Sequence, residues 1–168
     1  MGVLRVLLAI AVVAVHSKGH IFGLTFTGGR IAVQSFYIIS GFYMTMILNE
    51  KYIGSNNSYK LFITNRLLRL YPIYWTVLIL TIILCVTYYL YNGEGITLMQ
   101  YINNPIRFSS YLFLISSQFL IIGQDIVMFL GIDTTGDLFL TSNWKETSPK
   151  LYKFLFVPQA WTIGVEIL

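Results

Sequence analysis

The residues best suited to chemistry in this chain are two arginines, Arg66 and Arg69, which stand just before a long apolar run. In a helix, residues three apart share a face, so the two guanidinium groups would point the same way. Paired guanidinium groups bind phosphates or carboxylates through charge-assisted hydrogen bonds. The same pair also suits a simple anchor at the cytoplasmic surface of a membrane, where basic residues gather. Taken alone, the pair leaves both interpretations open.

A second group of candidates lies at the start of the chain. Arg5 precedes the apolar run Val6–Val15, and His16 follows it. From Arg5 to His16 a helix makes about three turns and rises about 16 Å, so the two residues fall on one face. A histidine at the end of an apolar helix is more often a packing or interfacial residue than a catalyst. The same run also fits a secretory signal peptide as an alternative to a membrane helix.

The composition is that of a membrane protein. Hydrophobic residues make up 56% of the chain and charged residues 11%, whereas about 25% of a soluble domain is charged. The net charge of +4 comes from basic residues scattered between apolar runs, so the lipid bilayer is the expected partner and nucleic acid is not. The single cysteine, Cys85, excludes a disulfide framework, and no third ligand accompanies His16 and His20, so no metal site is expected.

The apolar runs predict an all-α fold, a polytopic bundle of transmembrane helices. We expect about four spans and the start of a fifth at Pro158; the four are Val6–Val15 with its flanking residues, Ile31–Leu48, Leu70–Tyr91 and Ser109–Gly131. Because the chain stops at Leu168 inside the fifth apolar run, it is expected to be truncated. The connection from Asn49 to Asn65 is basic, which makes it and the amino terminus cytoplasmic by the positive-inside rule.

Several residues are expected to serve packing and topology. Ser40 and Gly41 are small enough to let two membrane helices approach closely. Pro72 is expected in the first turn of its helix, where a missing amide hydrogen is tolerated. Tyr71, Tyr74 and Trp75 are expected to form an aromatic belt at the membrane interface. Asp125 lies in the predicted fourth span, so we expect it to face the protein interior or, preferably, to lie near the cytoplasmic end.

Three motifs stand in order along the chain: Arg5 and His16 with ten residues between them, Arg66-Leu67-Leu68-Arg69 before a spanning helix, and Trp161-Thr162-Ile163-Gly164-Val165-Glu166. A further run, from Gln34 to Tyr43, leads through apolar residues into Ser-Gly-Phe. With these motifs in this order, the chain resembles the membrane-bound acyltransferase 3 family. Family members are longer, so residues 1–168 are similar to the amino-terminal part of a single acyltransferase-like transmembrane domain. Thr162 stands where the family usually has serine.

The resemblance implies an integral membrane O-acyltransferase of the cell membrane. Members of the family transfer acetyl or other acyl groups to sugars of surface polysaccharides, peptidoglycan and lipid-linked glycans. For this chain it implies transfer of an acyl group, expected to be acetyl, from cytoplasmic acyl-CoA to a sugar hydroxyl of a cell-surface glycan. Acyl-CoA is then a donor substrate, and no bound cofactor is expected.

The resemblance also assigns roles to residues. Arg66, Arg69 and Arg5 would bind the phosphates of the donor. His16 would act as general base on the sugar hydroxyl or would itself carry the acyl group. Glu166 would orient and charge-stabilise the imidazole, and Thr162, one helical turn away, would offer a hydroxyl group to the substrate.

Two non-enzymatic alternatives remain. Arginines at helix ends and a buried acid also mark the substrate path of a transporter, so the chain is alternatively half of a polytopic transporter. The sequence shows no internal repeat and no paired broken helices, which such transporters usually have. The other alternative is a non-catalytic membrane protein whose charges only determine topology. The sequence does not identify an oligomeric state.

Overall fold

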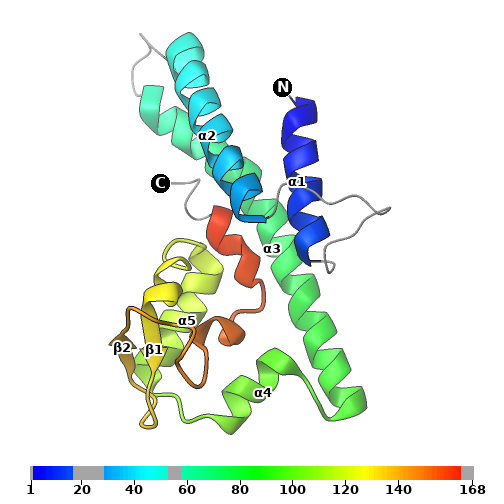
Figure 1. The fold of residues 1–168 in the computed structure, drawn as a ribbon, viewed down its shortest axis with the longest axis vertical. Coiled ribbons are helices and arrows are strands. Elements are labelled where there is room, and N and C mark those ends of the chain that lie inside the picture. The colour runs from blue at the N-terminus through cyan, green and yellow to red at the C-terminus, as the bar shows by residue number, and fades with distance from the viewer. Residues whose placement is uncertain (1, 17–28, 53–57, 164–168) are drawn as a thin grey trace. The chain divides into compact units, whose positions relative to one another are not determined.

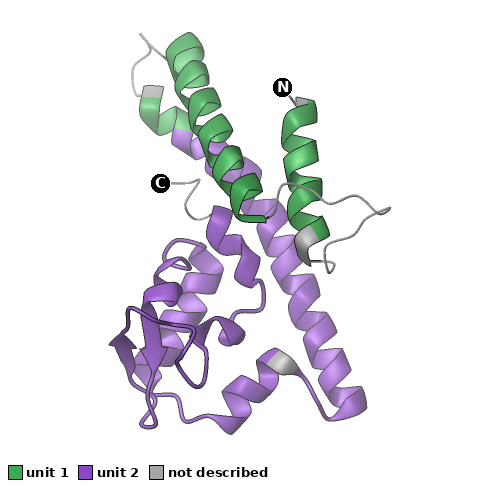
Figure 2. Ribbon diagram, viewed as in Figure 1, with its two compact units in different colours: residues 1–62 green, residues 63–168 purple. Residues whose placement is uncertain are grey.

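The computed structural model describes residues 2–16, 29–52 and 58–163. Most of these residues are helical, as expected, and one short hairpin departs from an all-α fold (Figure 1). The chain divides into two compact units, Met1–Phe62 and Ile63–Leu168 (Figure 2). The candidate residues of the sequence are therefore distributed over two units.

The first unit contains two apolar helices, α1 (Gly2–His16) and α2 (Gly29–Ile47), and a π-helical turn over Leu48–Tyr52. Small residues are buried where α1 and α2 pack together: Ala11, Ala14, Ala32 and Ser40. Small side chains let two helices approach closely, so the packing expected of Ser40 is confirmed. For Gly41 it stays a prediction, and no described residue lies within 4 Å of a Cβ atom placed there.

Helix α3 (Ser58–Asn92) is 35 residues long and begins well before the predicted start at Leu70. The residues taken as a polar connection are helical from Ser58, and the ring of Phe62 in the first turns packs edge-to-face on Tyr52 at 5.5 Å. Pro72 consequently lies inside the helix and not in its first turn. A proline there removes one helical hydrogen bond, but the helix continues on both sides.

The predicted fourth span is wrong beyond Leu120. Helix α5 (Phe108–Leu120) has 13 residues and rises about 20 Å, less than the about 30 Å of a bilayer core. The following residues form a 3-10 turn over Ile126–Phe129 and a hairpin of β1 (Leu130–Ile132) and β2 (Leu138–Leu140), which lies beside α5 (Figure 1). Asp125 precedes the 3-10 turn, so the prediction that it lies inside a span is also wrong.

The hairpin is antiparallel, with Leu130 opposite Leu140 and Ile132 opposite Leu138. Another helix, α4 (Ile96–Asn103), lies between α3 and α5 along the chain. The hairpin, α5 and the 3-10 turn over Leu151–Phe154 share one apolar core, with Leu114, Val127, Ile132, Leu151, Phe154 and Leu155 buried. A second core joins α3 to the turn over Pro158–Ala160 through Tyr74, Leu78, Ile121 and Ala160.

Two helical segments are long and apolar enough to cross a membrane. They are Gly29–Tyr52, with a mean hydropathy of 1.6, and Tyr59–Asn92, with 2.1. Only 11% of the most apolar window of each is buried, so most of their apolar side chains are left to contact another apolar medium. The other apolar helices, Val3–Ala14 and Phe108–Leu120, are shorter. The expected count of four spans stays a prediction.

Candidate functional site

Arg66 and Arg69 both lie on α3, three residues apart, as the sequence predicts. They share a face of the helix and are separated by about 4.5 Å along its axis. The side chain of Arg66 is half-buried and that of Arg69 is exposed. Because α3 begins at Ser58, the pair lies two turns inside the helix and not at its mouth. The rigid backbone of a continuous helix therefore sets the spacing of the two guanidinium groups.

The aromatic residues that follow the arginines make hydrogen bonds to α5, and their place in an interfacial belt stays a prediction. The hydroxyl groups of Tyr71 and Tyr74 donate hydrogen bonds to the carbonyl oxygens of Leu120 and Gln118, and the indole Nε1 of Trp75 donates to that of Phe119 at 3.1 Å. These are the last carbonyl groups of α5, which have no partner within their own helix. One face of α3 thus caps the carboxyl end of α5.

Two glutamines that appear in the sequence only as polar breaks in an apolar stretch are buried in this region. Gln124 is 1% exposed and donates a 3.2 Å hydrogen bond from Nε2 to the hydroxyl oxygen of Tyr74. Gln118 is 4% exposed, and its Oε1 accepts a 2.9 Å hydrogen bond from the backbone amide of Phe156. In the sequence, a polar side chain inside an apolar run indicates that its position makes polar contacts. The sequence pattern does not identify the partners of those contacts.

Gln118 also connects α5 to α4. Its Nε2 donates to the hydroxyl oxygen of Tyr101 at 3.2 Å, and that hydroxyl donates to the carbonyl oxygen of Phe154 at 2.8 Å. Burial raises the pKa of Tyr101 to about 12, although the hydrogen bond from Gln118 opposes the shift. Tyr101 is therefore neutral at physiological pH and keeps its donor. Gln118 and Tyr101 together hold the backbone of residues 154–156.

This network supports the segment that carries the third sequence motif. Residues 154–156 lead to the 3-10 turn at Pro158–Ala160, in which Ala160 is buried against Tyr74 and Leu78 of α3. Thr162 follows in helical conformation, and its hydroxyl donates to the carbonyl oxygen of Gln159 at 2.9 Å. The hydrogen of this hydroxyl is thus used locally, and no hydrogen bond to its oxygen is found among the described residues. Glu166 lies outside the described residues.

Arg5 has its partners in the first unit. Its Nη2 donates to the hydroxyl of the buried Ser40 at 3.3 Å, and its guanidinium carbon lies 4.8 Å from the ring centre of Tyr43 and 5.8 Å from that of Phe36. These contacts orient the guanidinium group against α2. His16 is the last residue of α1, so Arg5 and His16 share a helix as predicted. The side chain of His16 lies outside the described part.

The structure thus places Arg5 and His16 on one helix of the first unit, and Arg66, Arg69 and Thr162 in the second unit. Within the described residues, no three histidine, cysteine, aspartate or glutamate side chains are grouped as a metal site requires. Within the second unit, the described geometry offers two cations on one face of α3 and a hydroxyl group on a supported segment. Within the first unit it offers one oriented cation, Arg5. Cations of this kind can bind an anionic group.

Comparison with known proteins gives one match. A family model described as an acyltransferase domain, that of the acyltransferase 3 family, matches residues 1–168. No curated protein and no solved structure matches the chain. The family match covers all three motifs, including His16 and Glu166. The chain therefore belongs to the acyltransferase 3 family, as its arginine, histidine and glutamate motifs suggested.

Proposed function

We propose that this membrane-associated member of an acyltransferase family is an integral membrane O-acyltransferase. It transfers an acyl group, in the simplest case acetyl, from cytoplasmic acyl-CoA to a sugar hydroxyl of a cell-surface glycan. The observation that carries the proposal furthest is the arginine pair on α3, because two guanidinium groups at one turn suit the phosphates of coenzyme A.

The length of α3 supports a place for this pair at the membrane surface. Its 35 residues extend over about 52 Å, whereas the hydrocarbon core of a bilayer is about 30 Å thick. The apolar part starts at Leu70, so Arg66 and Arg69 come directly before it and meet the aqueous side. A donor that arrives in the cytoplasm would find the pair without entering the hydrocarbon core.

Arg5 is proposed as a third contact to the donor. Ser40 and Tyr43 hold its guanidinium group. An oriented guanidinium group binds a phosphate with less loss of side-chain entropy than a mobile one.

The proposed chemistry is attack of the sugar hydroxyl on the thioester carbonyl. A bond forms between the sugar oxygen and the acyl carbon, the bond from that carbon to sulfur breaks, and His16 moves the proton from the hydroxyl to the departing thiolate. In a two-step variant, the acyl group passes first to the His16 imidazole and then to the sugar. Glu166 would stabilise the imidazolium, and the hydroxyl oxygen of Thr162 would accept a hydrogen bond from the acceptor.

The test is acyl transfer from labelled acetyl-CoA in membranes of cells that express the complete gene. Arg66→Ala should raise the KM for the donor about 10- to 100-fold, because a hydrogen bond to a charged group contributes about 1.5–3 kcal/mol. Arg66→Lys should restore part of the loss, since it keeps the charge but not the fork. Lys60→Ala is the matched control, because Lys60 is an exposed cation on the same helix.

The His16 variant separates binding from chemistry. His16→Ala should reduce kcat with little effect on the KM for the donor. If labelled glycan forms at the normal rate in both His16→Ala and Arg66→Ala, the proposed function is wrong. Uptake of the glycan without transfer of label would favour the transporter alternative.

A further inference from the structure

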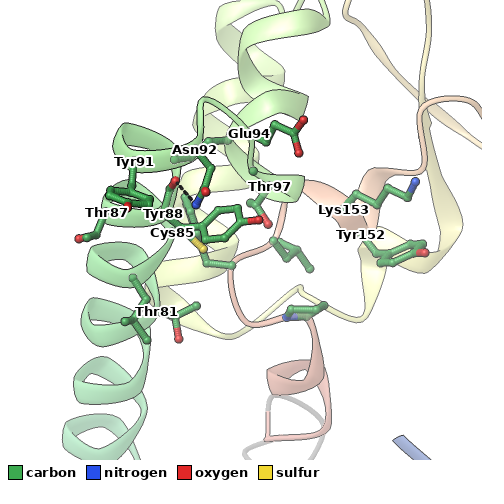
Figure 3. Close-up of a pocket in the computed structure, with 16 residues that line it drawn as sticks. Thr81, Cys85, Thr87, Tyr88, Tyr91, Asn92, Glu94, Thr97, Tyr152 and Lys153 are labelled. Carbon is green, nitrogen blue, oxygen red and sulfur yellow. Dashed lines mark hydrogen bonds between the residues drawn. The ribbon is translucent and has the colours of Figure 1, made fainter. Parts of the chain in front are cut away.

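An apolar groove lies along the carboxyl-terminal half of α3, opposite the start of α4 and residues 152–158 (Figure 3). Its volume is about 860 Å³, which is in the range of sites that hold one small molecule. Tyr88 and Cys85 reach from α3 toward Thr97 of α4, and Tyr152 and Lys153 lie on the other side (Figure 3). The apolar wall is formed by Leu84, Cys85, Leu98, Leu155, Phe156 and Pro158.

A second cavity of about 260 Å³ lies next to the groove, and Leu98 and Phe156 line both. The second cavity extends along α3 to Leu78 and ends against Gln118 of α5. From Leu78 to Asn92 the α3 helix rises about 21 Å. We call the two cavities together the α3 groove. The α3 residues that line the two cavities run from Leu78 to Asn92, so an occupant of both would be extended and not compact.

Polarity changes along the α3 groove. The hydroxyl groups of Thr81 and Thr87 donate to the carbonyl oxygens of Val77 and Ile83 at 2.8 Å, so they bring no free donor to the middle of the groove. Polar side chains gather at its open end, where Asn92, Glu94, Thr97 and Lys153 line it. Among the described residues, no side-chain hydrogen bond or ion pair engages Glu94 or Lys153. The open end is therefore able to bind hydroxyl groups.

We infer that the α3 groove holds the hydrocarbon chain of a membrane amphiphile whose hydroxylated head lies between Glu94 and Lys153. The apolar wall would bury the chain, at about 0.8 kcal/mol per buried methylene group relative to water. The occupant belongs to the membrane because the groove follows a helix of spanning length and opens at the end where that helix stops. This end lies 26 residues from Arg66, or about 39 Å along α3.

The identity of the head group rests on the proposed function. If Arg66 marks the donor side, the open end of the α3 groove lies toward the opposite face of the membrane, where the acceptor is expected. The amphiphile would then be the lipid anchor of the acceptor, and the sugar that receives the acyl group would lie farther along the glycan than the hydroxyl groups between Glu94 and Lys153.

The test uses the complete protein in lipid nanodiscs and an octyl glucoside that carries a photoreactive diazirine in its alkyl chain. After irradiation, peptide mapping should place the label on residues 81–98 and 155–158, and unlabelled octyl glucoside should compete. Leu98→Trp should reduce the labelling several-fold, because the larger side chain fills the groove at a residue that lines both cavities. The matched control is Ile102→Trp, on the same helix but exposed and outside the groove.

A second variant keeps the test valid if Leu98→Trp does not fold. Leu98→Ala should remove side-chain atoms that line both cavities, so that the label moves toward Leu78 and Ile115 of the second cavity. Labelling that spreads equally to Leu90, which is 78% exposed and outside the groove, would overturn the inference. A folded, transferring protein without label in the groove would overturn it as well, because another part of the protein would then fill that space.

The same nanodiscs separate this inference from the proposed function. Specific groove labelling without acyl transfer from acetyl-CoA would support the amphiphile site and count against the acyltransferase proposal. Acyl transfer that is unchanged by Leu98→Trp, together with unchanged labelling, would support the acyltransferase proposal and overturn the amphiphile site.

Discussion

Helix α5 and the part of α3 from Ile63 onward lie in the same compact unit, and the two helices end in different ways. At the end of α3, Gly93 has a φ of 70° and its amide donates to the carbonyl oxygen of Tyr89 at 2.8 Å. The side chain of Asn92 donates to the carbonyl oxygen of Tyr88 at 3.2 Å. A glycine in the left-handed region directly after the last helical residue is a common helix terminator. The residues of α3 and its neighbour therefore end this helix by themselves.

Helix α5 ends through contacts with other parts of the unit. Its last carbonyl groups accept hydrogen bonds from Tyr71, Tyr74 and Trp75 of α3. The next residue, Ile121, has a φ of 64° although it is not glycine, a conformation that costs about 1–2 kcal/mol. Full burial of the Ile121 side chain against Tyr74 offsets that cost.

The amino end of α5 is also held by another segment. The residue before the helix, Arg107, makes no side-chain capping bond. Instead, the hairpin turn lies over this end: the carbonyl oxygen of Gly136 accepts from the Arg107 amide at 3.1 Å and from the Ser110 hydroxyl at 2.7 Å. Arg107 Nη1 and Asp137 Oδ2 form an ion pair at 2.6 Å. Helix α3 is therefore ended by its own residues and the glycine after it, whereas α5 depends on contacts with other segments at both ends.

Of the substitutions that test this comparison, Tyr74→Phe is expected to change the stability of the protein most. The change leaves the carbonyl oxygen of Gln118 and the amide nitrogen of Gln124 without the hydroxyl that they share. Each unsatisfied buried group costs about 1–3 kcal/mol, so we expect a loss of about 2–4 kcal/mol in the free energy of unfolding. Thermal unfolding in detergent, followed by tryptophan fluorescence, measures it.

Tyr88→Phe is the matched control for Tyr74→Phe. Tyr88 lies on the same helix, is 55% exposed, and makes no side-chain hydrogen bond within the described residues. Its replacement should leave the unfolding temperature nearly unchanged. If Tyr74→Phe is equally harmless, the carboxyl end of α5 does not depend on α3 as we describe.

A smaller effect is expected from Gly93→Ala at the end of α3. A Cβ atom at Gly93 would meet nothing within 4 Å, so the cost comes from the backbone conformation alone, about 1–2 kcal/mol. Because α3 ends locally, the loss should be confined to its last turn, which faster hydrogen exchange of the amides around residues 90–93 would show. Gly95→Ala is the control: its backbone is extended, and its Cβ atom would make an ordinary contact with Tyr89. Faster exchange throughout α5 would contradict local termination.

The same difference explains what the sequence predicts well and what it does not. The end of α3, expected at Tyr91 and found at Asn92, is visible because Asn-Gly follows an apolar run. The end of α5 is not visible, because Ile121 and Ile122 continue the apolar pattern and the groups that stop the helix lie on α3. The start of α3 was missed because hydropathy marks the apolar part of a helix and not its polar extension at 58–69.

In the candidate site, too, local features are visible in the sequence and tertiary contacts are not. That Arg66 and Arg69 share one helix, and that Arg5 and His16 share another, follows from their spacing and is confirmed. The partners of Arg5 on α2 and the support of residues 154–162 by Gln118 depend on tertiary contacts, which spacing does not encode. The roles of His16 and Glu166 stay predictions.

The smallest expected effect concerns Asp133, in the hairpin turn that holds the amino end of α5. Its Oδ1 accepts hydrogen bonds from the Thr135 hydroxyl at 2.7 Å and from the backbone amides of Thr135 and Asp137, both at 2.9 Å. These bonds, chiefly the one from the Thr135 hydroxyl, hold the pKa of Asp133 below its ordinary value of 3.8. A lowered pKa in the folded state contributes stability above the unfolded pKa, and this contribution is lost as the pH falls through the folded pKa.

We therefore expect the hairpin turn to loosen below about pH 4, and α5 to fray at its amino end before α3 is affected. Hydrogen exchange of the amides of residues 108–112 between pH 5 and pH 3, corrected for intrinsic exchange, measures this loosening. Asp133→Asn should flatten the pH dependence, because the amide does not titrate. Asp125→Asn is the control, since Asp125 makes no side-chain capping bond to the turn that follows it. An unchanged pH dependence in Asp133→Asn would show that the hairpin turn does not transmit its protonation to α5.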